Sequence, residues 1–157
     1  MKYLESWMVV YKKDKICLIS SMFITSLLSY IFKLDYKDIS IEALTVVSVF
    51  IVVYTTSFSG LVGTKLAKEM KEKQDKNIEE KTELGVLRSY YNCSFIFAIV
   101  TIILSCVCEI INARYEKIQT EMWYIIYSMI SYSLFMGNLC LAVIVNRFMM
   151  NRQLWNA

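Results

Sequence analysis

The chain has 157 residues, of which 57% are hydrophobic and 20% charged, and its formal net charge is +3 at pH 7. A soluble domain of this size is usually about 45–50% apolar, so the composition argues against an ordinary soluble protein. The chain has no histidine, no phosphate-binding glycine motif and no nucleophile motif, which argues against an enzyme, and its interleaved charges argue against direct nucleic-acid binding.

The residue pattern of the first segment, 1–15, predicts a short amphipathic helix lying in the lipid headgroup zone. Its aromatic and aliphatic residues fall on one helical face, where Trp7 and Tyr11 are expected to anchor the segment. The alternative is a terminus without fixed structure. Basic residues at 12, 13 and 15 precede an apolar run, as in a signal peptide, but no small-x-small cleavage site follows. We therefore expect this run to be retained as a membrane span.

Four windows without Asp, Glu, Lys or Arg follow in the chain: 16–32, 43–64, 89–108 and 122–146. A helix needs about 20 apolar residues to cross a bilayer, and three windows meet that length. Lysines can extend the first by snorkelling from its ends. The sequence thus predicts an all-α integral membrane protein whose four transmembrane helices form two antiparallel hairpins, over 16–33, 42–64, 89–111 and 121–147. Trp123 and Trp155 are further expected interfacial anchors.

The connection between the second and third spans, residues 65–88, carries seven basic and six acidic residues in small alternating blocks. Pairs four residues apart, such as Lys65 and Glu69, support an exposed helix. We expect a cytoplasmic helical hairpin that continues the second span, turns near residues 75–77 and leads into the third. Its expected seam is Leu66, Met70, Ile78, Leu84 and Leu87, and its expected partner-docking residues are Lys68, Lys71, Lys73, Glu79 and Glu80. A plain solvated loop is the alternative.

The distribution of basic residues predicts the topology. With the N-terminus in the cytoplasm, 13 of the 17 Lys and Arg residues lie on the cytoplasmic side. The positive-inside rule then places both termini, the 65–88 connection and the tail at 148–157 in the cytoplasm, with the protein in the cell inner membrane.

Each span carries a stripe of small or hydroxyl-bearing residues. Between helices in lipid there is little hydrophobic driving force, and small residues let helix backbones approach closely. One interpretation is that the stripes pack the four helices into one bundle. The other is that at least one stripe faces water in an oligomeric pore. The pore-lining or helix-packing candidates are Thr45, Ser48, Thr55, Ser59, Gly60, Gly63, Thr101, Ser105, Gly137 and Asn138.

The five cysteines all lie inside the apolar windows, where free Cys commonly packs as a small, weakly polar residue. Cys106 and Cys108, at i and i+2, would point to different sides of a helix, and no histidine is available to complete a metal site. We expect no metal, no cofactor and no catalytic residue.

These features predict a small bacterial inner-membrane protein that acts as a homo-oligomeric pore or membrane-perturbing effector, in phage defence or lysis. The alternative is a non-conducting membrane anchor or sensor subunit that signals to a cytoplasmic protein partner through the 65–88 hairpin. No ionisable residue lies in the middle of a span, which argues against an ion-coupled transporter. The expected partners are membrane lipid and further copies of the chain.

Overall fold

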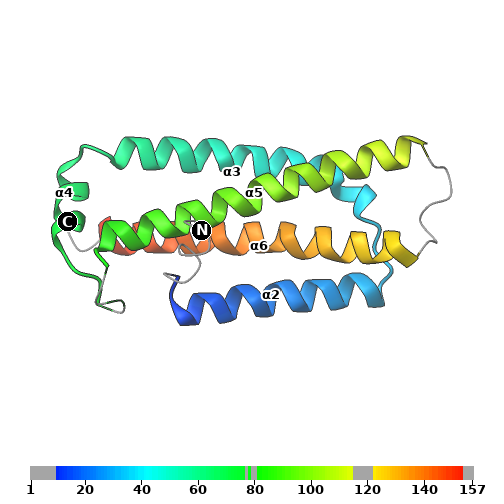
Figure 1. Cartoon of the computed structure of the whole chain (residues 1–157), viewed down its shortest axis with the longest axis horizontal. Coiled ribbons are helices and arrows are strands. Elements are labelled where there is room, and N and C mark those ends of the chain that lie inside the picture. The colour runs from blue at the N-terminus through cyan, green and yellow to red at the C-terminus, as the bar shows by residue number, and fades with distance from the viewer. Residues whose placement is uncertain (1–9, 77, 79–80, 115–121, 154–157) are drawn as a thin grey trace.

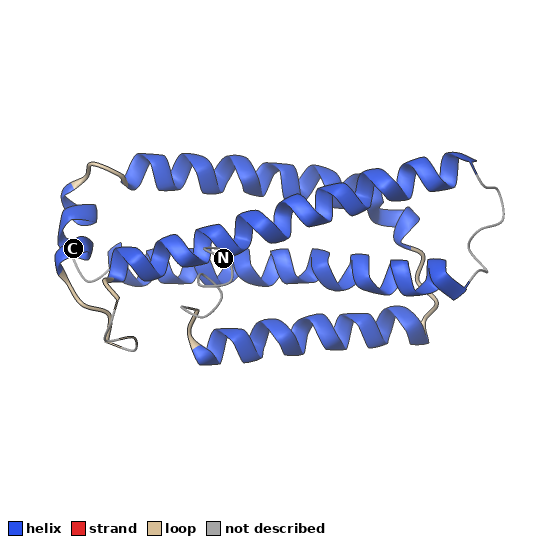
Figure 2. Cartoon of the chain, in the orientation of Figure 1, coloured by secondary structure: helices blue, strands red, loops and turns tan. Residues whose placement is uncertain are grey.

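The computed structural model describes residues 10–76, 78, 81–114 and 122–153, and for 151–153 it describes the backbone alone. Figure 2 shows that the described chain is built from helices and loops. The helices are α2 (Lys12–Ile31), the 3-10 helix η1 (Tyr36–Ile39), α3 (Ser40–Leu61), α4 (Lys65–Glu72), α5 (Glu83–Arg114) and α6 (Met122–Gln153). The only extended pairing among the described residues is an isolated bridge between Gln74 and Thr82.

Within the described part of the chain, four segments are long and apolar enough to cross a membrane: Lys12–Ile31, Tyr36–Leu61, Glu83–Arg114 and Met122–Met150. The predicted all-helical class and the four candidate spans are therefore confirmed. The fourth-span helix continues past the predicted boundary at 147, and the third-span helix begins before residue 89. That early start has a local cause, because the Thr82 hydroxyl accepts a hydrogen bond from the Gly85 N–H at 3.2 Å and caps the helix.

The four long helices lie side by side in the order α2, α6, α5, α3, as Figure 1 shows. Although α2 and α3 are consecutive in the chain, α2 packs on α6 and α3 packs on α5. The packing of the described helices therefore does not show the first two spans as the hairpin that we expected. The connector between them crosses the ends of α5 and α6, because the Tyr36 N–H donates to Ser128 Oγ at 2.7 Å and the Tyr36 hydroxyl bonds Ser105 Oγ at 2.8 Å.

The two edge helices expose much of their apolar surface. Phe23 on α2 is 69% exposed, and Val52 on α3 is 63% exposed. Apolar side chains this open along a whole helix are typical of surfaces that contact lipid or another protein. The central helix α5, in contrast, buries its small-residue stripe, which consists of Ser94, Ala98, Thr101, Ser105 and Cys108.

The 65–88 connection differs from the expected helical hairpin. α3 ends at Leu61, and Gly63 turns the chain with a φ of 92°, in the left-handed region that favours glycine. The Thr64 hydroxyl then accepts from the Ala67 N–H at 3.2 Å and starts the separate helix α4. The prediction of one helix continuing from the second span was therefore wrong.

Beyond α4 an isolated bridge pairs Gln74 with Thr82, and the expected second arm is present as the first turns of α5, which begins at Glu83. The Asp75 N–H donates to the Lys81 carbonyl at 2.8 Å, and the Glu83 N–H donates to the Lys73 carbonyl at 3.0 Å. Figure 1 shows α4 lying across one end of the long helices. The apolar residues expected at the seam do gather, in one cluster with the ends of α3, α5 and α6: Leu66, Met70, Ile78, Leu84 and Leu87.

Candidate functional site

The outer face of α3 is the first candidate surface. Thr45, Ser48, Thr55 and Ser59 are all exposed on it, on the side away from α5. Gly60 continues this face, and a Cβ added there would meet no atom within 4 Å. The small-residue stripe of the second span is therefore not used for packing inside one copy of the chain.

Three of the four hydroxyl groups on this face donate back to their own helix. Thr45 Oγ1 lies 2.9 Å from the Ile41 carbonyl, Ser48 Oγ 2.7 Å from the Leu44 carbonyl, and Thr55 Oγ1 2.7 Å from the Ile51 carbonyl. Each donor is thus satisfied, while each hydroxyl oxygen keeps acceptor capacity on the outside. Such a face can lie against lipid or a neighbouring helix without a lost hydrogen bond, and it can also accept hydrogen bonds from water.

Four of the predicted stripe residues lie inside the subunit instead: Thr101, Ser105, Gly137 and Asn138. The Asn138 amide donates to Thr101 Oγ1 at 2.6 Å and lies 3.0 Å from the Leu134 carbonyl. A Cβ at Gly137 would lie 3.1 Å from the Phe97 ring and 3.3 Å from Met22 Sδ, so α6 meets both α5 and α2 at this glycine. For these four residues the packing interpretation describes the structure, and Gly63 ends α3 rather than lining a face.

A cluster of tyrosine and aspartate side chains joins the start of α2 to α5 and the connection. The Tyr90 hydroxyl donates to the Asp14 carboxylate and accepts from the Tyr11 N–H at 3.1 Å, while the Tyr11 hydroxyl donates to the buried carboxylate of Asp75. The Tyr11 ring also packs edge-on against Tyr90, with 5.8 Å between centroids. Tyr11 is therefore a tertiary contact residue, and its expected role as an interfacial anchor stays a prediction.

Sequence reasoning missed this cluster because its members are 64 to 79 residues apart. Helical periodicity reports neighbours within one helix and carries no information on such pairs. A polar Asp14 among lysines at the start of an apolar span was the available signal.

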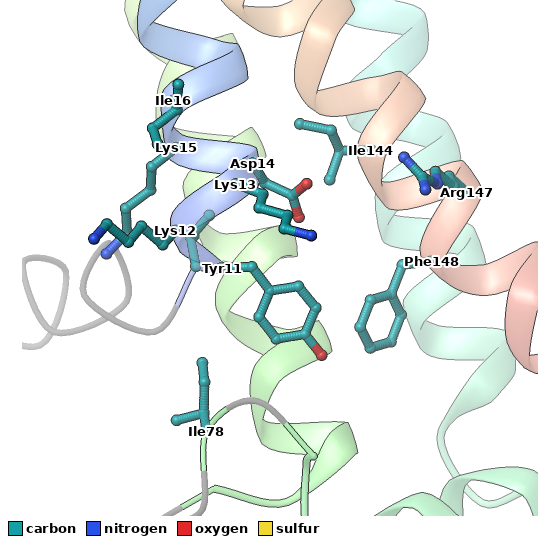
Figure 3. Close-up of a pocket in the computed structure, with 11 residues that line it drawn as sticks. Tyr11, Lys12, Lys13, Asp14, Lys15, Ile16, Ile78, Ile144, Arg147 and Phe148 are labelled. Carbon is teal, nitrogen blue, oxygen red and sulfur yellow. The ribbon is translucent and has the colours of Figure 1, made fainter.

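A cavity of about 860 Å³ opens beside this cluster, between the first turns of α2 and the last turns of α6 (Figure 3). Basic side chains line it from both helices: Lys12, Lys13 and Lys15 from α2 and Arg147 from α6. Its apolar lining includes Ile16, Ile144 and Phe148. Asp14 is the acidic residue in the lining.

The predicted docking residues separate into two groups. Lys68 and Lys71 are exposed on α4, whose opposite face buries Ala67 and Met70. Lys73 instead pairs with Glu83 at 3.7 Å, and the Glu83 side chain is only 2% exposed, so Lys73 has a structural contact. Glu79 and Glu80 lie outside the described residues.

One of the three expected tryptophan anchors lies among the described residues. Trp123 is 49% exposed near the start of α6, while Trp7 and Trp155 lie outside the described residues. All five cysteines are free; Cys93 and Cys108 are buried, whereas Cys17 and Cys106 are exposed. Among the described residues, no group of three or more His, Cys, Asp or Glu side chains is placed to hold a metal ion.

A second polar network holds the opposite end of the helices. The Tyr124 hydroxyl donates to Asp35 Oδ1 at 2.8 Å and accepts from the Asn112 amide at 2.9 Å. The Ser128 hydroxyl donates to the Leu34 carbonyl at 3.0 Å while it accepts from Tyr36. This network fixes the α2–α3 connector to α5 and α6, and no sequence pattern indicated it.

Comparison with known proteins adds no relative: no protein-family model, no curated protein and no solved structure matches the chain. The function of the chain is therefore inferred from its own residues.

Proposed function

We propose that the protein is a membrane protein that assembles from several copies into a pore or a membrane-perturbing oligomer, with the outer faces of α3 turned toward one another. The observation that carries this proposal is the exposure of Thr45, Ser48, Thr55 and Ser59 on an edge helix, while the equivalent stripe of α5 is buried. A role in lysis or phage defence would follow from such an activity and stays a prediction.

The packing inside one copy favours an assembly over a single-subunit channel. The seam between the central helices is filled at mid-length by the contact of Gly137 with Phe97 and by the bond of Asn138 to Thr101. A path for water therefore needs the surface of a neighbouring copy. α3 has 22 residues and is thus about 33 Å long, which matches the hydrocarbon thickness of a bilayer.

The test is the single-channel conductance of the purified protein in a planar bilayer, measured together with its mass in detergent. We expect discrete conductance from a defined oligomer, and we expect Thr55→Leu and Ser59→Leu to reduce or abolish it while membrane insertion is unchanged. Ser20→Leu is the matched control, because Ser20 is an exposed serine on α2, the opposite edge helix. Equal conductance in all variants would show that the α3 face does not line the path.

A non-conducting anchor or sensor is the second candidate, and the exposed basic face of α4 favours it. Lys68 and Lys71 point away from the cluster in which Ala67 and Met70 are buried. Charge reversal at both lysines should abolish capture of a cytoplasmic partner while the mass of the oligomer is unchanged. A defined oligomer without conductance would favour this candidate, whereas capture that survives the reversal would contradict it.

A further inference from the structure

The cavity between α2 and α6 combines a basic rim with an apolar wall. In Figure 3 Lys13 extends from α2 toward α6, and Tyr11 and Phe148 face each other below it. The two rings are 6.2 Å apart between centroids, so they form a continuous aromatic floor. A volume of about 860 Å³ lies within the range of about 300–1,000 Å³ typical of small-molecule sites.

The charge balance of this lining favours an anion. Four basic side chains line the cavity against the single carboxylate of Asp14, and one oxygen of that carboxylate already accepts the Tyr90 hydroxyl. Within the described residues, no acidic oxygen lies within 4.0 Å of Lys12, Lys13 or Arg147. These three cations are therefore not neutralised by an ion pair of the described chain and can attract a negatively charged group.

The apolar lining leads from this basic rim toward the candidate spans. Ile16 is 57% exposed one turn into α2, and Ile144 lies on the facing side of α6. Both residues belong to segments long and apolar enough to cross a membrane. A ligand that fills the cavity thus meets cations at one end and hydrocarbon at the other, which is the arrangement of a phospholipid.

We propose that this cavity binds an anionic phospholipid, with the phosphate between Lys13 and Arg147 and the start of an acyl chain against Ile16 and Ile144. Basic groups near the ends of membrane helices attract anionic headgroups in this way. The proposal rests on the chain lying in a membrane and is independent of whether the assembled protein conducts.

Occupancy of the site is coupled to the cytoplasmic connection. Tyr11 lines the cavity and donates its hydroxyl to Asp75, and Asp75 Oδ1 accepts from the Ile78 N–H at 3.1 Å. A lipid that orders Tyr11 therefore orders this loop as well. Hydrogen exchange at the Ile78 and Lys81 amides, which are both hydrogen-bonded in the loop, should slow on lipid binding.

The test is a titration of the purified full-length protein with dioleoylphosphatidylglycerol or dioleoylphosphatidylcholine, with bound lipid counted by native mass spectrometry. We expect one phosphatidylglycerol per chain at the site, bound at least about tenfold more tightly than phosphatidylcholine. Each basic residue near an anionic lipid contributes about fivefold, so the double variant K13A/R147A should bind phosphatidylglycerol about 30-fold more weakly. K68A/K71A removes the same charge from α4, outside the cavity, and should bind like the wild type.

Three results would overturn the proposal. Equal affinity for the two lipids would show that charge does not select the ligand, and equal weakening in the two double variants would show a general charge effect. Displacement of phosphatidylglycerol by a tenfold excess of inorganic phosphate would show a free-anion site instead. Because Ile16 is exposed and serine is uncharged, Ile16→Ser should fold and yet bind phosphatidylglycerol more weakly, which keeps the proposal testable if K13A/R147A does not fold. A silent bilayer alongside intact lipid binding would count against the pore only.

Discussion

Replacing Gly137 and Gly60 with larger residues should separate packing inside one copy from packing between copies. At Gly137 an added Cβ would lie 3.1 and 3.2 Å from two Phe97 ring carbons and 3.3 Å from Met22 Sδ. Ordinary carbon contacts are about 3.5–4.0 Å, so the helices must move apart slightly at both the α5–α6 and the α2–α6 interface. At Gly60, on α3, the same atom meets nothing within 4 Å.

The expected changes in the free energy of unfolding follow from this difference in space around the two glycines. Overpacking a filled interface costs about 1–3 kcal/mol, and alanine regains about 0.5–1 kcal/mol over glycine from helix propensity. We expect Gly137→Ala to lower the free energy of unfolding by about 1 kcal/mol, or about 2–4 °C in Tm for a chain of this size. Gly137→Leu adds three further carbons and should cost about 3 kcal/mol or more. Gly60→Ala should be neutral or slightly stabilising within one copy.

The assay is thermal unfolding in mild detergent, followed by circular dichroism, with the mass of the oligomer measured on the same samples. Gly137→Leu should lower the Tm, whereas Gly60→Leu should leave the Tm of the monomer unchanged and reduce the mass of the assembly. A Gly137→Leu variant as stable as the wild type would refute the packing argument. A Gly60→Leu variant with an unchanged oligomer would show that copies do not meet through this end of α3.

Three further predictions concern the polar contacts. Tyr90→Phe removes the hydroxyl that bonds Asp14 and Tyr11 and should cost about 1–3 kcal/mol, with faster hydrogen exchange of the Tyr11 amide, whereas unchanged exchange would contradict that bond. Ser128→Ala strands the buried Tyr36 N–H and should cost about 1–3 kcal/mol in thermal unfolding, and a neutral result would argue against the connector contact. Lys73→Met should destabilise the protein more than Lys71→Met, because of these two lysines only Lys73 faces the buried Glu83. Equal melting temperatures of the two variants would contradict this prediction.

Local sequence patterns were sufficient to predict the helices but not the residues at which the helices end. Charge-free windows indicated all four candidate spans, because a helix that crosses hydrocarbon needs about 20 predominantly apolar residues. The end of α3 was mispredicted, although both causes were visible in the sequence as Gly63 and Thr64. The alternating charges after Thr64 favoured a continuous helix, and a single glycine in the left-handed region outweighed them.

The order of residues in the sequence was sufficient to predict four long apolar helices with stripes of small residues, because hydropathy and helical spacing are properties of each segment alone. Only the tertiary structure decided which stripe is buried. The stripes of α3 and α5 are similar in residue type, yet α5 lies between two helices and α3 lies at an edge. The same is true of the basic cavity. Lys13 and Arg147 are far apart in the chain, and both line this cavity only because α2 packs on α6.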